Sequence, residues 1–153
     1  MENSPIQYLI DRYISLNFQV HKKAEALIKG KIGDDLTNDQ YYILKYIYQT
    51  GECTSSDLAA VFEVNKSAIT AIINRMVDKG LIERTRDEND RRVIYLTLSD
   101  EGKELHQNCM KKVRVLVESI ITQFDEVEIT SFLDTYEKLA QMINNKKKEE
   151  LGE

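Results

Sequence analysis

The sequence predicts a mainly α-helical fold with one small β-hairpin. Apolar residues recur at helical spacing along most of the 153 residues, and there is a single proline to interrupt a helix. One stretch departs from this pattern: two short β-type runs, Leu81 to Arg86 and Val93 to Leu98, follow Gly80 and flank the charged loop 87–92. Two short helices precede this hairpin, so the fold class is a winged helix-turn-helix, with further helices before and after it.

The composition excludes several classes of protein. A hydrophobic content of 42% with 31% charged residues describes a soluble globular chain, long enough for one domain with a core. The N-terminus has neither the basic segment nor the unbroken apolar run of a signal peptide. No run approaches the roughly 18 apolar residues that a membrane span requires. We therefore expect a cytoplasmic protein with no membrane partner.

The first predicted helix covers residues 5–28. Its apolar side chains follow a helical spacing but occupy more than one face, so the helix must pack against more than one neighbour. Gly30 and Gly33 are expected to end it.

Two capping signals divide the next segment. Thr37 and Gln40 form a capping box at the start of a helix that Gly51 ends. Thr54 opens a second signal, Thr-Ser-Ser-Asp, before a short apolar set that reaches Phe62.

The next predicted helix runs from the N-cap Asn65 to about Lys79, after a turn of three or four residues. Two short helices joined in this way are typical of the helix-turn-helix, in which the first helix crosses the DNA backbone and the second enters the major groove. The expected inward face of the second helix consists of Ala68, Ile69, Ile72, Ile73, Met76 and Val77.

Two long helices complete the chain. Ser99 is expected to cap a helix that reaches about Thr122, and Asp125 with Glu128 forms a capping box for the last one. Both helices have an apolar side, and the charged tail 146–153 is expected to fray.

The solvent side of the helix 65–79 is the first candidate for DNA contact. Lysine and hydroxyl groups can bond phosphates or base edges, an asparagine amide can bond an adenine edge bidentately, and a methyl group can meet a thymine methyl. Residues near the helix start lie deepest in the groove. An amphipathic surface helix of any function would also have a polar face. The candidates are Lys66, Ser67 and Thr70 first, then Ala71, Asn74 and Arg75.

The loop of the hairpin favours the interpretation that this segment binds DNA. Arg91 and Arg92 lie near its tip, where a guanidinium can reach into an adjacent minor groove. Asp90 is interpreted as a partner that orients an arginine through a charge-assisted pair. Residues 63–96 carry seven basic and six acidic side chains, a balance of +1 in a chain of net charge -5. The local polarity suits DNA but is mild, so tight non-specific binding is not expected.

Other functions find little support in the sequence. With two distant histidines, no glycine-rich phosphate loop and no spacing of nucleophile and base, we expect no enzyme and no cofactor. His21 and His106 could supply two metal ligands but lack a third, so we expect solvent-facing histidines and no metal site. Cys53 and Cys109 are expected to be small, partly buried hydrophobes.

A rival reading is a winged helix that serves as a protein-interaction scaffold without sequence-specific DNA binding. Such a scaffold would not need paired arginines at the loop tip, whereas a DNA reader would.

The run from Val64 to Gly102 resembles the winged helix-turn-helix of the MarR (multiple antibiotic resistance regulator) family. The resemblance includes the junction MVDKGLIER, the triplet Asp90-Arg91-Arg92 where the family has Asp-x-Arg, and LTLSDEG after it. Leu36-Thr37, followed by Gln40, is similar to the start of the family's second helix. The likeness extends over the whole chain in helix order.

The resemblance implies a homodimeric transcriptional regulator, a repressor, that binds a pseudopalindromic double-stranded DNA operator. Segments 1–36 and 99–153 would interlock for dimerisation, and each module 37–98 would read one half-site. Arg92 would enter the minor groove with Asp90 as its support. Ser67, Thr70 and Asn74 would fall on recognition positions, with Lys66 beside them. Ala71 stands where relatives often carry a larger polar residue, which leaves the operator sequence open.

The resemblance also implies release from DNA, commonly by a phenolic or other aromatic anion bound between the dimerisation helices and the winged module, by cysteine oxidation, or by zinc. Neither Cys53 nor Cys109 has an obvious cationic neighbour in sequence, which disfavours oxidation sensing. Aromatic side chains on the helices that should border this cleft are more often core residues than ligand contacts. The effector residues predicted here are Tyr13, Tyr41 and Tyr46, among the wider set Tyr8, Phe18 and Tyr42.

Overall fold

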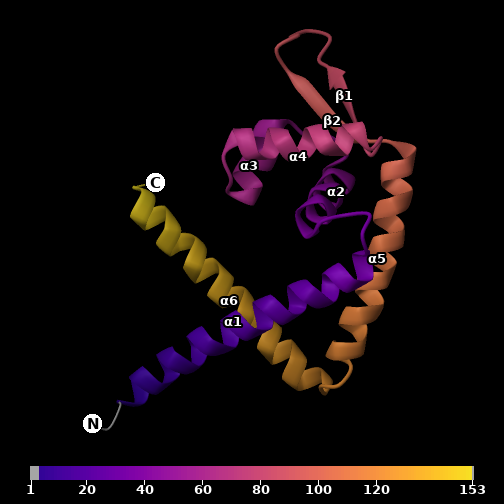
Figure 1. Cartoon of the computed structure of the whole chain (residues 1–153). Helices are drawn as coiled ribbons and strands as arrows, with labels where there is room; N and C mark the ends of the chain where they lie inside the picture. The colour runs from indigo at the N-terminus through magenta and orange to yellow at the C-terminus, as the bar shows by residue number, and fades with distance from the viewer. Residues whose placement is uncertain (1–3, 153) are drawn as a thin grey trace. The chain divides into compact units, whose positions relative to one another are not determined.

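The computed structural model describes residues 4–152, which form six α-helices and one two-stranded antiparallel sheet (Figure 1). The predicted fold class is confirmed. None of the helices in this range combines the length and apolarity needed to cross a lipid bilayer.

Helix α1 (Pro5–Ile32) starts where the Ser4 hydroxyl accepts a hydrogen bond from the Gln7 amide at 3.3 Å. It continues through Gly30, so the prediction that Gly30 ends it was wrong. A glycine inside a helix costs only about 1 kcal/mol relative to alanine, which a long helix tolerates. The helix ends at Gly33, whose φ of 78° an L side chain rarely adopts.

Helices α2 (Asn38–Thr50), α3 (Ser55–Phe62) and α4 (Lys66–Asp78) follow, each with the predicted cap. The capping boxes at Thr37 and Thr54 have both of their reciprocal bonds, and the Asn65 carboxamide accepts from the Ala68 amide at 2.8 Å. A left-handed residue, Glu63, makes the tight turn between α3 and α4. The helix-turn-helix therefore arises from local capping chemistry.

The buried stripe of α4 consists of Ile69, Ile73 and Met76. Ala68, predicted to face inward, is exposed, because the buried stripe begins one residue later. The rest of the prediction for this face agrees with the structure.

Strands β1 (Ile82–Arg86) and β2 (Ile94–Leu98) pair antiparallel, from Ile82 opposite Leu98 to Arg86 opposite Ile94. The hairpin has a third extended neighbour that was not predicted: Cys53 forms a bridge with Leu96, with amide to carbonyl distances of 3.2 and 2.7 Å. A single extended residue between Gly51 and the cap Thr54 is too short to show periodicity.

Helix α5 (Asp100–Ile121) is attached to the base of this hairpin. The Ser99 hydroxyl accepts from the Gly102 amide at 3.0 Å and donates to the Gly80 carbonyl at 2.6 Å. Gly102 lies so close to Leu81, the residue before β1, that an added Cβ would be 2.1 Å from the Leu81 carbonyl oxygen. The glycine is therefore required by the close approach of two backbones.

The core joins α2, α3, α4, the hairpin and the first turns of α5. Leu44, Ile47, Leu58 and Met76 are completely buried in it. Cys53 and Cys109 are also buried in this core, as predicted, and burial raises the pKa of the Cys53 thiol to about 11.

The chain divides into two compact units, Met1–Val113 and Arg114–Glu153. The second holds the end of α5 and helix α6 (Glu126–Leu151), which the Asp125 carboxylate caps by accepting from the Glu128 amide at 2.8 Å. The charged tail does not fray before Leu151, in contrast to the prediction: Lys146 and Glu149 pair at 3.4 Å and Gly152 caps the helix. The predicted roles of segments 1–36, 37–98 and 99–153 stay a prediction.

Candidate nucleic-acid interface

One face of helix α4 is polar and open to solvent. It lies opposite the buried Ile69, Ile73 and Met76, as the helical period requires. The first turn of α4 has no acidic residue, so the partial positive charge of the helix N-terminus is not neutralised there. This end of α4 is suited to an anion such as a phosphate. The exposed residues are Lys66, Ser67, Thr70, Ala71, Asn74 and Arg75, the complete predicted set.

Two of these side chains are already engaged. The Thr70 hydroxyl donates to the Lys66 carbonyl at 2.8 Å, so toward DNA it offers its oxygen lone pairs and its methyl group. The Asn74 amide oxygen accepts a hydrogen bond from the Arg84 guanidinium on β1. Arg84 was not among the predicted residues, because no local pattern relates a strand residue to a helix residue ten positions earlier.

The hairpin β1–β2 with its loop 87–93, here called the wing, holds Arg92 in a fixed arrangement. Its Nε and Nη2 donate to the two carboxylate oxygens of Asp90 at 3.1 and 3.2 Å, and its backbone amide donates to the same carboxylate at 3.1 Å. These bonds lower the pKa of Asp90 below its usual value. The predicted pairing of Asp90 with an arginine is present, and the Arg92 side chain is 91% exposed.

The acidic residues of the loop have a structural role. Asp87 accepts from the amides of Asn89 and Asp90 at 2.8 and 3.1 Å, which closes the turn and lowers the pKa of Asp87. The Arg86 guanidinium donates to the Arg91 carbonyl at 3.4 Å across the base of the same loop. Asp87 and Asp90, although they reduce the positive charge of the loop, therefore shape the loop that presents the arginines.

Lys79 does not belong to the polar face of α4. Its ammonium donates to the Asp35 carbonyl at 3.0 Å and to the Gln40 side-chain oxygen at 3.4 Å. It connects the end of α4 to the start of α2. Without Lys79, segment 63–96 has six basic and six acidic side chains, so an attraction to DNA depends on where the remaining cations lie and not on a net positive charge.

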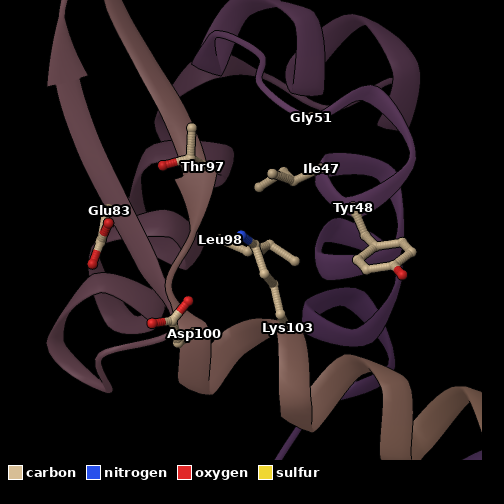
Figure 2. A pocket seen from close by; sticks show the side chains of 8 residues that line it. All are labelled: Ile47, Tyr48, Gly51, Glu83, Thr97, Leu98, Asp100 and Lys103. Carbon is tan, nitrogen blue, oxygen red and sulfur yellow. The ribbon is translucent and has the colours of Figure 1, made fainter.

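A cavity of about 450 Å³ lies between α2, the base of the wing and the start of α5. Figure 2 shows Lys103 from α5 extending toward Leu98 of β2 and Ile47 of α2, with Glu83 and Thr97 on the strands. Tyr41 is 3% exposed in the core, Tyr46 is half-buried against it, and Tyr13 is exposed on α1. None of these three lines this cavity, whereas Tyr48 does; their effector role stays a prediction.

The prediction that both histidines face solvent was wrong for His106. It is buried on α5 between Tyr48 and Tyr41, with ring centroids 4.7 and 6.1 Å away, and its Nδ1 has no hydrogen-bond partner within residues 4–152. Burial, aided by Lys45, lowers the pKa of His106. His21 is exposed as predicted. Within the same described range, no cluster of three or more metal-ligating side chains occurs.

Comparisons with known proteins agree with this geometry. A family model described as "MarR family" matches residues 36–94. The HTH-type transcriptional regulator YwhA of Bacillus subtilis is 30% identical over 120 residues, which are 78% of this chain and 86% of YwhA. The B. subtilis transcriptional repressor MdtR is 27% identical over 95% of this chain and 94% of MdtR. Streptococcus pneumoniae FabT, solved in complex with DNA, superposes with a TM-score of 0.76 and 26% identity over 92% of this chain and 98% of FabT.

Proposed function

Because this chain belongs to the MarR family of helix-turn-helix transcriptional regulators, we propose that it represses transcription as a homodimer bound to a pseudopalindromic DNA operator. One observation carries the proposal: the same compact unit holds both the exposed polar face of α4 and the exposed wing arginine Arg92, which Asp90 holds by hydrogen bonds. In this arrangement α4 reads the major groove and Arg92 the adjacent minor groove.

Recognition is divided among few groups. Lys66, Ser67 and Thr70 lie in the first turns of α4, where a recognition helix reaches base edges. Arg75 and Arg91 contact phosphates. The methyl group of Ala71 meets a thymine methyl. The relatives named above are consistent with this proposal: MdtR is a repressor and FabT has been solved with DNA.

The proposed dimer rests on the two terminal helices, each considered by itself. Along α1 the apolar residues Ile6, Ile14, Phe18 and Val20 are at least 60% exposed, and on α6 Val127 is 80% exposed. No residue of α6 is buried in the chain alone. Apolar surface on this scale is typical of an interface. A second copy of the chain would cover both helices and bring two α4 helices to one operator.

A small aromatic or anionic ligand, acting as effector, completes the proposal. The cavity beside Lys103 adjoins both the wing and α5, so a ligand there would touch the elements that present and position the DNA-binding face. The predicted residues Tyr13, Tyr41 and Tyr46 are the second place to test. Binding to chromosomal operators would occur in the cytoplasm.

Footprinting with the purified protein on the DNA that flanks its own gene tests the proposed function. We expect two protected half-sites about 34 Å apart, one helical turn, related by a two-fold axis. Unrelated DNA of equal length, at the same salt concentration, is the control because phosphate binding is strongly salt-dependent. A protein-interaction scaffold would protect neither DNA.

A further inference from the structure

Arg84 lies between the two elements that the proposed binding mode places in neighbouring grooves, helix α4 and the loop of the wing. It is on β1, on the same face as Ile82, and it pairs across the hairpin with Leu96. Ile82 and Leu96 are buried in the core, whereas Arg84 is exposed where this face leaves the core. Its guanidinium donates a hydrogen bond to the amide oxygen of Asn74, which places the guanidinium beside α4.

The charge of Arg84 is not compensated within the chain. Its hydrogen-bond partner Asn74 is a neutral amide, whereas Arg92 is held by the carboxylate of Asp90. Within residues 4–152, no ion pair involves Arg84. A guanidinium has five N–H groups, and the bond to Asn74 uses one of them. The other donors, and the whole positive charge, are therefore available to an anion.

A DNA phosphate is the anion that this position would meet. With α4 in the major groove and Arg92 in the adjacent minor groove, the sugar–phosphate strand that separates the two grooves passes between α4 and the loop of the wing. Arg84 connects β1 to α4 and so lies on the surface that this strand would cross. A planar guanidinium matches a phosphate, because two of its N–H groups can donate to two phosphate oxygens.

We propose that Arg84 is a further DNA-binding residue, which contacts the phosphate strand between the major groove and the minor groove that one subunit occupies. This inference rests on the proposed DNA-binding function. Because phosphates carry no sequence information directly, Arg84 raises the affinity for duplex DNA in general and leaves base preference to other residues. Segment 63–96 has a net charge of only +1, so its attraction to DNA depends on cations that, like Arg84, have no acidic partner.

Fluorescence anisotropy at several salt concentrations tests this contact. The probes are the fragment that footprinting identifies in the DNA flanking the gene, and an unrelated duplex of equal length. The logarithm of the affinity falls linearly with the logarithm of the salt concentration, with a slope of about 0.9 for each phosphate contact. A dimer has two copies of Arg84, so Arg84→Ala should reduce the slope by about 1.8 on both probes. Its loss of affinity should then be about twelvefold larger at about 50 mM salt than at about 200 mM.

Two control variants separate the charge from other effects of the substitution. Arg84→Lys keeps the charge, so it should retain the wild-type slope even though it loses the planar donor group. Lys111→Ala removes one positive charge from an exposed position on α5, in the same compact unit but outside α4 and the wing, so it should leave slope and affinity unchanged. Arg84→Ala should also retain the wild-type melting temperature, since the side chain is exposed.

A wild-type slope for Arg84→Ala would overturn the inference. An equal reduction of the slope in Lys111→Ala would also overturn it, because the effect would then come from the net charge of the protein. A loss confined to the footprinted fragment would make Arg84 a base contact and would contradict the phosphate contact. The proposed function fails separately: a wild-type protein that binds both probes equally is no sequence-specific repressor, while a slope that depends on Arg84 would still support the phosphate contact.

Discussion

Arg92 shows how an exposed charged side chain can be held in one position in the free protein. Holding a long, exposed side chain in one position costs conformational entropy. Three hydrogen bonds to the Asp90 carboxylate offset this cost in the free protein. Because the same carboxylate neutralises part of the charge, we expect Arg92 to contribute to the proposed DNA binding more through its shape and position than through net charge.

We therefore expect Arg92→Ala to weaken operator binding by about 1–3 kcal/mol while leaving the melting temperature and the oligomeric state unchanged. Asp90→Asn removes the clamp but leaves the guanidinium, so a smaller loss is expected. Glu88→Gln, an exposed residue of the same loop, is the control. Fluorescence anisotropy at fixed salt measures all three. Wild-type affinity in Arg92→Ala would contradict the role assigned to the wing.

His106 is a buried base whose protonation opposes folding. Burial lowers its pKa in the folded protein, so the neutral form is favoured there. The contribution of neutral His106 to the free energy of unfolding is then fully present above the unfolded pKa of about 6.5. It is lost as the pH decreases toward and through the lower pKa of the folded protein. Protonation would place a charge between Tyr41 and Tyr48, close to the Lys45 ammonium.

The expected result is a free energy of unfolding that decreases below pH about 6.5, by at most about 1.4 kcal/mol per pH unit from this group. His106→Phe should remove this part of the pH dependence. Urea unfolding over a series of pH values measures it. His21→Ala, which removes the exposed histidine, should retain the wild-type dependence; equal slopes for wild type and His106→Phe would refute the assignment.

The junction between the wing and α5 requires a residue without a side chain, Gly102, because two backbones approach closely there. Ser99 connects the start of α5 to Gly80, and Gly102 allows the α5 backbone to approach the Leu81 carbonyl. The wing is thus attached to α5 by backbone contacts that a larger residue would separate. Any change in this junction should also alter the orientation of the wing.

Gly102→Ala should destabilise the fold by about 1–3 kcal/mol, since the added methyl group would overlap backbone that cannot move aside. Gly30→Ala is a matched control: within α1 its new methyl group meets nothing within 4 Å, and alanine favours a helix by about 1 kcal/mol. The midpoints of urea unfolding should therefore move in opposite directions. A neutral Gly102→Ala would show that the junction is looser than the structure indicates.

For the whole molecule, the exposed apolar residues of α1 and α6 lead us to expect a dimer at micromolar concentration. The side chain of Phe132, which stacks on Tyr136 with ring centroids 5.4 Å apart, is 56% exposed on α6. Phe132→Glu should shift the sedimentation of the protein toward that of a monomer and weaken operator binding. Arg92→Ala should remain a dimer, and a monomeric wild type would contradict the proposed architecture.

The sequence by itself determined the features that depend on neighbours within about one helical turn. The caps at Thr37, Thr54 and Asn65, the exposed face of α4 and the pairing of Asp90 with Arg92 could all be predicted, because each rests on residues no more than four positions apart. The helical period then decided which side of α4 faces solvent.

Only the tertiary structure decided which distant groups meet. Arg84 engages the oxygen of Asn74, Lys79 is turned to the start of α2, Cys53 joins β2, and His106 is buried between two tyrosines. These contacts depend on how the helices and the hairpin pack together. Hydrophobic burial directs that packing, and it is not directional, so the sequence pattern of apolar residues does not show which polar groups will meet. For that reason the sequence could place Asn74 on the exposed face of α4, while only the fold could show that Arg84 contacts its amide oxygen.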